Sequence, residues 1–166
     1  LEWTQVTTTP PLIYAPRRAV QRLGFVQRVV ALGIALACLA VLVTAVALVP
    51  HASGIGTHIA LGMRPCGFEQ RSGLPCATCG MTTSFSHFAK ADFLSSAYVQ
   101  PMGLVLAVLT GITFWASLYV ALTARPAHRL LKILPVTRIV FCLLGFAALA
   151  WLWKIVLRLN GWDGHA

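Results

Sequence analysis

Three long stretches without a charged residue constrain this 166-residue chain more than any other feature of its sequence. Residues 29–49 and 102–124 form uncharged runs of 21 and 23 residues, and residues 139–153 form a third run of 15. About 20 apolar residues, at a rise of about 1.5 Å each, cross a hydrocarbon layer of about 30 Å as a helix. The first two runs are long enough to do so. The third reaches this length if Lys154 and Arg158 extend their charged ends to the far surface.

The composition agrees with a membrane protein. Hydrophobic residues make up 58% of the chain, charged residues only 10%, and the mean hydropathy is +0.78, whereas soluble domains carry about 25% charged residues. We therefore predict an all-α integral membrane protein with three transmembrane helices. No Asp, Glu, Lys, Arg or His lies in the central part of any span. Transporters and proton relays need such groups inside the membrane, so the sequence argues against transport by this chain alone.

The uneven distribution of basic residues predicts the topology. The arm before the first span and the loop between the second and third spans hold eight of them: Arg17, Arg18, Arg22, Arg28, Arg125, Arg129, Lys132 and Arg138. The long loop after the first span and the far end of the third span hold the other five. The positive-inside rule then places the N-terminus in the cytoplasm and the long loop outside, in a multi-pass protein of a bacterial cytoplasmic (inner) membrane. A basic excess of this kind reflects topology and anionic lipid, so we expect no nucleic-acid partner.

The spans and basic segments divide the chain into seven parts. In chain order these are an N-terminal arm with a basic interfacial helix (1–28), the first transmembrane helix (29–49), an extracytoplasmic cysteine-containing loop (50–101), the second transmembrane helix (102–124), a basic cytoplasmic loop (125–138), the third transmembrane helix (139–158) and a C-terminal tail (159–166). In the long loop, the helical spacing of Met81, Phe85 and Phe88 predicts one short helix, and a capping signal at Asp92 predicts another. Each is apolar on one side, so we expect interfacial or re-entrant helices.

Three of the five cysteines lie in the long loop, at Cys66, Cys76 and Cys79, in a C-x9-C-x2-C arrangement. The other two, Cys38 and Cys142, lie in predicted spans, where a free cysteine behaves as a small apolar residue, and we assign them no role. A c-type haem is excluded, because glycine follows the C-x-x-C pair where haem attachment needs histidine. The loop cysteines are therefore the candidates for chemistry.

Zinc binding is one interpretation of this arrangement. The backbone of a C-x-x-C-G knuckle turns so that both sulfurs face one point, and Gly80 permits the turn. Tetrahedral Zn²⁺ takes four ligands, and Cys66 would supply the third. The fourth would be a histidine, for which the sequence offers His87, His58 and His51; we include His87 in the candidate set.

Two other interpretations use the thiols without a metal. A structural disulfide from Cys66 to Cys76 or Cys79 would close a loop of about 10 to 13 residues and stabilise it by roughly 3 kcal/mol; this is the leading interpretation. A redox dithiol would use Cys76 as nucleophile and Cys79 as resolving thiol, because the helix expected after Gly80 favours a thiolate at its N-terminus. No strand and no thioredoxin-like pattern surrounds the pair, which weakens the redox interpretation.

The stretch SGLPCATCGMT at residues 72–82 follows Cys66 and precedes Asp92 and Pro101. In this order of residues the chain resembles a family of small bacterial integral membrane proteins catalogued as a domain of unknown function, with a core like T-G-x-P-C-P-x-C-G-x-T-R. The resemblance covers about 40 residues, from Cys66 to about Leu106. It implies a membrane-embedded helical domain stapled by cysteines, and it brings no activity with it.

The chain also departs from the family pattern. Gly67 and Ala77 stand where the family has proline, and Thr83 stands where it has arginine. Ala91 replaces a glycine, and Gln100 replaces an asparagine. Loss of the arginine speaks against an anion-binding or catalytic role of the motif. The cysteines and the acid at Asp92 remain, as expected if the retained part is architectural.

These observations predict a non-catalytic small polytopic membrane protein with a cysteine-stapled outer loop, acting as an accessory or structural subunit. Its expected partners are the lipid bilayer and a larger membrane protein complex, because small residues recur along the spans at spacings that allow close helix packing. Two alternatives stay open. One is a membrane-tethered thiol–disulfide oxidoreductase using Cys76 and Cys79, and the other is a zinc-binding membrane protein.

Overall fold

The computed structural model describes residues 23–51, 53–125 and 135–162, and every regular element in these ranges is helical. Three helices are long and apolar enough to cross a membrane: α1 (Phe25–Ala47), α5 (Pro101–Thr123) and α7 (Val136–Leu159). This confirms the prediction of an all-α chain with three transmembrane helices. Most of the predicted N-terminal arm and basic loop, and the end of the tail, lie outside the described residues.

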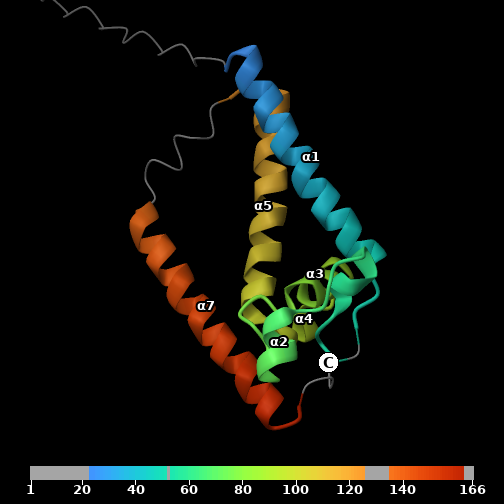
Figure 1. The fold of residues 1–166 in the computed structure, drawn as a ribbon. Coiled ribbons are helices and arrows are strands. Elements are labelled where there is room, and N and C mark those ends of the chain that lie inside the picture. Colours follow the sequence, from blue (N-terminus) through green and yellow to red (C-terminus); the bar gives the residue numbers. More distant parts are fainter. Residues whose placement is uncertain (1–22, 52, 126–134, 163–166) are drawn as a thin grey trace, which may run out of the picture.

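α1 and α5 form an antiparallel pair, as Figure 1 shows. Their buried residues are nearly all small: Ala31, Ala35 and Ala45 in α1, and Met102, Gly103, Ala107 and Ala121 in α5. Small residues allow helix backbones to approach closely in lipid. At one end of the pair, Arg28 Nε donates a hydrogen bond to the Ala121 carbonyl oxygen at 3.0 Å. This oxygen belongs to the last turn of α5, whose carbonyls have no partner within the helix, so Arg28 ties the start of α1 to the end of α5.

Four short elements connect α1 to α5 and gather at the other end of the pair: the 3₁₀ helix η1 (Thr57–Leu61), and the helices α2 (Gly67–Ser72), α3 (Met81–Ala89) and α4 (Phe93–Val99). α3 lies between α1 and α5 and contacts both. Asp92 caps α4 by accepting a hydrogen bond from the Ser95 backbone N–H at 3.2 Å. The short helices expected in the long loop are therefore present.

The short helices are joined by buried hydroxyls as well as by apolar contacts. Ser84 of α3 is fully buried, and its Oγ donates to the carbonyl oxygens of Ser96 and Gln100 at 2.9 and 3.1 Å. Ser86, also fully buried, donates to the carbonyl oxygen of Leu48, just after α1, at 2.6 Å. Because backbone carbonyls need partners where water is absent, Ser86 provides a partner for the Leu48 carbonyl. The carbonyls of Ser96 and Gln100 also accept backbone N–H bonds, so the bonds from Ser84 serve chiefly to fix α3 against α4 and the start of α5.

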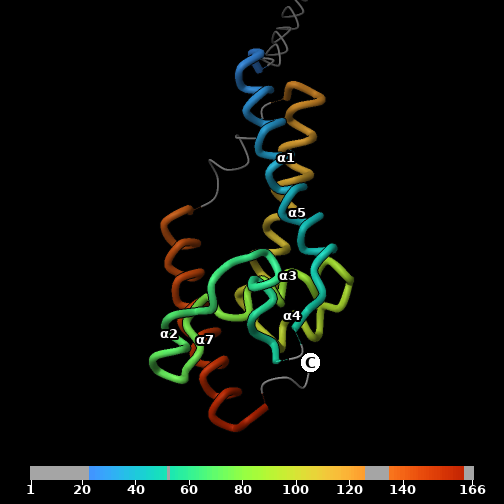
Figure 2. The backbone as a smooth tube through the Cα atoms, turned by 45° about the vertical axis from the view of Figure 1, so that its right-hand side comes forward, coloured from blue at the N-terminus to red at the C-terminus, as the bar shows by residue number. Residues whose placement is uncertain are grey.

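α7 stands apart from α1 and α5 over much of its length and approaches the rest of the chain near α2 (Figures 1 and 2). At that end Trp153 Nε1 donates to the Tyr98 carbonyl oxygen at 3.0 Å, and Arg158 lies 3.6 Å from Glu69 of α2. Lys154, expected to extend to the membrane surface, is instead buried, with 1% of its surface exposed. The third long helix is thus attached at this end through the segment between α1 and α5, and it also contacts α5.

Candidate metal centre

Two segments of this connecting loop carry the cysteines, and helix boundaries position both. Cys66 is the N-cap residue of α2. α2 ends at Gly73, whose φ of 69° is in the left-handed region that favours glycine. The chain then enters the turn of Cys76 to Cys79, closed by a hydrogen bond from the Cys79 N–H to the Cys76 carbonyl oxygen at 3.1 Å. Because α2 is short and the chain turns after it, Cys76 and Cys79 come back close to Cys66.

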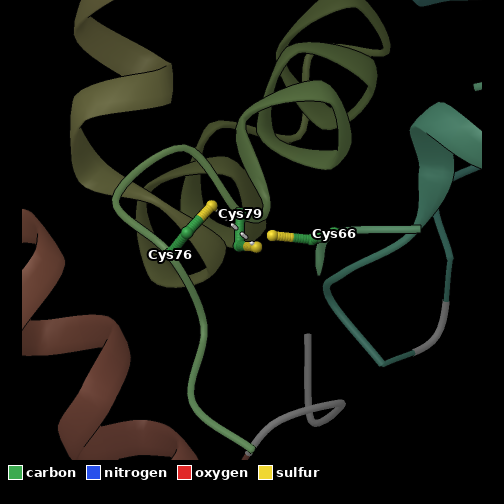
Figure 3. Close-up of side chains that lie close together, drawn as sticks. All are labelled: Cys66, Cys76 and Cys79. Atoms are coloured by element: carbon green, nitrogen blue, oxygen red, sulfur yellow. Dashed lines mark hydrogen bonds between the residues drawn. The ribbon is translucent and has the colours of Figure 1, made fainter. Parts of the chain in front are cut away.

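The three loop cysteines converge. Their Sγ atoms all lie within 4.8 Å of one another, and Figure 3 shows the side chain of Cys66 directed toward the pair Cys76 and Cys79. Cys76 Sγ and Cys79 Sγ are 3.1 Å apart. Cys79 is buried, whereas the other two are partly exposed. All three are free thiols in the structure. The group therefore offers three sulfur ligands to one ion.

The histidines considered for a fourth ligand do not join this group. His87 Nδ1 lies 3.0 Å from Asp92 Oδ2, in a pair that links α3 to the start of α4. His51 Nδ1 lies 2.8 Å from Ser53 Oγ, and His58 is in η1. Within the described ranges, no histidine or carboxylate atom completes the cysteine group. The structure thus brings together the three predicted cysteines and leaves the predicted histidines elsewhere.

The environments of the two C-x-x-C thiols differ. Burial raises the pKa of Cys76, but hydrogen bonds from Thr78 and Cys79 outweigh it and lower that pKa to about 7. Burial raises the pKa of Cys79 well above its ordinary value, and the interaction with Cys76 raises it further. When the pair loses a proton, Cys76 is therefore the thiol that ionises first.

Two polar side chains that the sequence analysis did not assign to the site hold the backbone of the turn. Gln100 Nε2 donates to the Ala77 carbonyl oxygen, and Trp151 Nε1 donates to the Pro75 carbonyl oxygen, both at 3.0 Å. In the sequence, Trp151 belongs to the uncharged run that predicts the third span, and nothing there links it to the cysteines. Its partner is a backbone carbonyl, so the sequence contains no matching side chain that would have revealed the contact.

The segment that carries these features also carries the similarity to known proteins. Residues 66–114 match the family described as protein of unknown function (DUF2752). The match includes all three loop cysteines and covers 49 residues, under a third of the chain, so it is a similarity of this segment. It agrees with the resemblance to a family of unknown function. No curated protein and no solved structure matches the chain.

Three thiolates are soft ligands that select ions such as Zn²⁺ and Cu⁺ over Mg²⁺ or Ca²⁺. A cluster of three cysteines from two segments could hold such an ion. The donor set thus fits zinc, the ion considered as an alternative to a disulfide in the sequence analysis.

Proposed function

We propose that this chain is a small multi-pass membrane protein whose outer loop is closed by a thiophilic metal ion, zinc in the first instance, bound by Cys66, Cys76 and Cys79. The observation that carries the proposal is the convergence of three sulfurs, from two segments, within 4.8 Å. A structural disulfide would join only two of them and leave the third beside the bond. A metal ion would use all three sulfurs, and because tetrahedral Zn²⁺ takes four ligands, a water molecule would fill the fourth position.

The metal would act as a fastener rather than as a catalyst. Cys66 precedes α2, whereas Cys76 and Cys79 precede α3, so one ion joins the two helices into a single unit. The accessory or structural role predicted from the sequence is part of this proposal. The proposal also includes the topology, in which the cysteine loop lies outside the membrane. In support of it, the ends of the long helices that adjoin the basic segments lie at the opposite end of the molecule from the short helices (Figure 1).

Metal analysis of the purified, detergent-solubilised chain tests the proposal. We expect about one zinc per chain when the protein is prepared with a reductant, and loss of that zinc in Cys66→Ser and in Cys76→Ser. Cys142→Ser is the matched control, because Cys142 is an exposed cysteine in α7 and should leave the metal content unchanged. A metal-free wild-type protein, or a Cys66→Ser variant that keeps its zinc, would contradict the three-thiolate centre.

A second candidate function is thiol–disulfide exchange, favoured by the 3.1 Å separation of Cys76 Sγ and Cys79 Sγ. In this reaction the Cys76 thiolate attacks the disulfide of a partner protein and forms a mixed disulfide, releasing one partner thiolate. Cys79 then attacks Cys76 Sγ, so that the pair becomes a disulfide and the partner leaves with two thiols. A Cys79→Ser variant should trap the mixed disulfide on non-reducing gels, and failure to trap any partner would exclude this function.

The accessory role has its own test, which does not depend on the metal. Mild extraction of the chain from its native membrane, followed by size-exclusion chromatography, should yield a complex larger than the chain and its detergent. A lone monomer that stays stable without a co-purifying protein would contradict an accessory role and would leave the metal centre unaffected.

A further inference from the structure

Helix α7 contacts the turn formed by Cys76 to Cys79, although α7 is not part of the loop between α1 and α5. Trp151 donates its Nε1 hydrogen bond to the carbonyl oxygen of Pro75, the residue directly before Cys76. Lys154 lies three residues further on, hence on the same face of the helix, and packs beside Gly80, which follows the second cysteine. Its Cε lies 3.6 Å from the position that a Cβ on Gly80 would occupy. One face of α7 therefore contacts both ends of the C-x-x-C turn.

Gln100 contacts the middle of the same turn. It precedes the first residue of α5, only 1% of its surface is exposed, and its Nε2 donates to the Ala77 carbonyl oxygen at 3.0 Å. Its Oε1 is buried and has no hydrogen-bond partner within the described part of the chain. A buried unpaired oxygen is costly, but turning the amide over would place that oxygen against the Ala77 carbonyl. The turn therefore fixes the orientation of Gln100, and Gln100 in return fixes the turn.

Two of the three proposed ligands lie in this turn, so its backbone sets where their sulfurs point. The hydrogen bonds from Trp151 and Gln100 hold that backbone in the conformation in which the sulfurs converge with Cys66. We infer that Trp151 and Gln100 are positioning residues of the metal centre, and that metal binding and the docking of α7 on the loop favour each other. The inference rests on the proposed function, and the coupling is reciprocal because each event must change the affinity of the other by the same factor.

The chain offers a matched pair of tryptophans for the test. Trp151→Phe removes the indole N–H that reaches the cysteine turn. Trp153→Phe removes an equivalent N–H, also at 3.0 Å from a carbonyl oxygen, but one that belongs to Tyr98 of α4. Each variant loses one neutral hydrogen bond of α7, so their thermal stabilities in detergent should fall by similar amounts. Any difference in metal binding then reports positioning rather than general loosening.

The measurement is zinc affinity of the full chain, by competition with a chromogenic chelator, together with the absorption spectrum of the Co²⁺-substituted protein. Residues that orient metal ligands typically change affinity by about 10- to 100-fold. We expect Trp151→Phe to weaken zinc binding about 10-fold and to alter the Co²⁺ bands, and Trp153→Phe to stay within about threefold of wild type. Gln100→Met, which keeps the length of the side chain but not its donor, should resemble Trp151→Phe.

The outcomes separate the inference from the proposed function. If the wild type binds zinc and Trp151→Phe, Trp153→Phe and Gln100→Met bind it equally well, the metal centre stands and the positioning inference is overturned. If the wild type binds no zinc, the proposed function fails and the inference fails with it. As a reciprocal check, zinc should slow hydrogen exchange in the C-terminal half of α7 in the wild type but not in Cys76→Ser. Exchange that does not respond to zinc would overturn the coupling.

Discussion

Gly103 is the position where one added methyl group tests the packing of the fold most directly. It lies in the first turn of α5, where α3 crosses, and a Cβ there would stand 2.7 Å from both Cβ and Oγ of Ser84. Carbon atoms in contact are normally about 3.5–4.0 Å apart. Ser84 has little freedom to move away, because it is fully buried and its Oγ bonds to Ser96 and Gln100.

The size of the effect follows from three terms. Alanine improves the helix propensity of Gly103 by about 1 kcal/mol. Overpacking a filled site costs about 1–3 kcal/mol, and displacing Ser84 from one of its hydrogen bonds costs about 1 kcal/mol more. We therefore expect Gly103→Ala to destabilise the protein by about 1–3 kcal/mol, although the same substitution in an open helix would stabilise it.

Gly111→Ala is the matched control, because Gly111 lies two turns further along α5 and a Cβ there meets nothing within 4 Å. Thermal unfolding in one detergent, followed by tryptophan fluorescence, should show Gly103→Ala melting below wild type and Gly111→Ala melting at or above it. Replacing Ser84 by glycine in the Gly103→Ala background should recover part of the loss. If the two alanine variants melt together, the close approach of α3 to α5 is wrong.

Two further predictions concern pH. In the metal-free, reduced protein, alkylation of Cys76 should follow an apparent pKa of about 7 and slow as the pH falls below it, whereas Cys79 should react only under strongly basic conditions. Thr78→Val removes a hydrogen bond that lowers the pKa of Cys76, so it should move the pH profile of Cys76 alkylation to higher pH. Equal pH profiles for the two cysteines would contradict the difference between their pKa values. The hydrogen bonds from Ser95 lower the pKa of Asp92 in the fold, so its contribution to stability is present above the unfolded pKa of about 3.9 and is lost as the pH falls through the folded value. Asp92→Asn keeps the cap and should flatten the fall in thermal stability between about pH 5 and pH 3, and an unchanged pH dependence would argue against this role.

The three long helices are predictable from sequence because hydropathy is a local property that adds along the chain. The uncharged run at residues 29–49 is enough to identify α1. It does not show where the helix begins, because α1 starts at Phe25 and includes Arg28. The guanidinium of Arg28 reaches a carbonyl of another helix, so a charged residue taken as a boundary is part of the helix.

The site is predictable only in part. Cysteine spacing identifies the candidate ligands, but the meeting of Cys66 with the pair depends on how far α2 runs before Gly73 ends it. His87 was only a candidate fourth ligand in the sequence, because its distance from the cysteines depends on the direction of α3. In the structure His87 pairs with Asp92 instead. Gln100 was noted only as a departure from the family pattern, because its partner is a backbone carbonyl.

If the loop holds the proposed metal ion, the two kinds of contact in the loop imply that its parts depend on that ion unequally. α3 and α4 are fixed to α1 and α5 by buried serine hydroxyls and by the close crossing at Gly103, contacts that need no cysteine. α2 has no buried residue, and the described structure links it to α7 by the ion pair of Glu69 and Arg158, an interaction partly exposed and therefore worth little. Chelation should thus free α2 and loosen the end of α7, while α3, α4 and the α1–α5 pair keep their packing. A loop that unfolds as a whole when zinc is removed would show that the serines, too, depend on the metal.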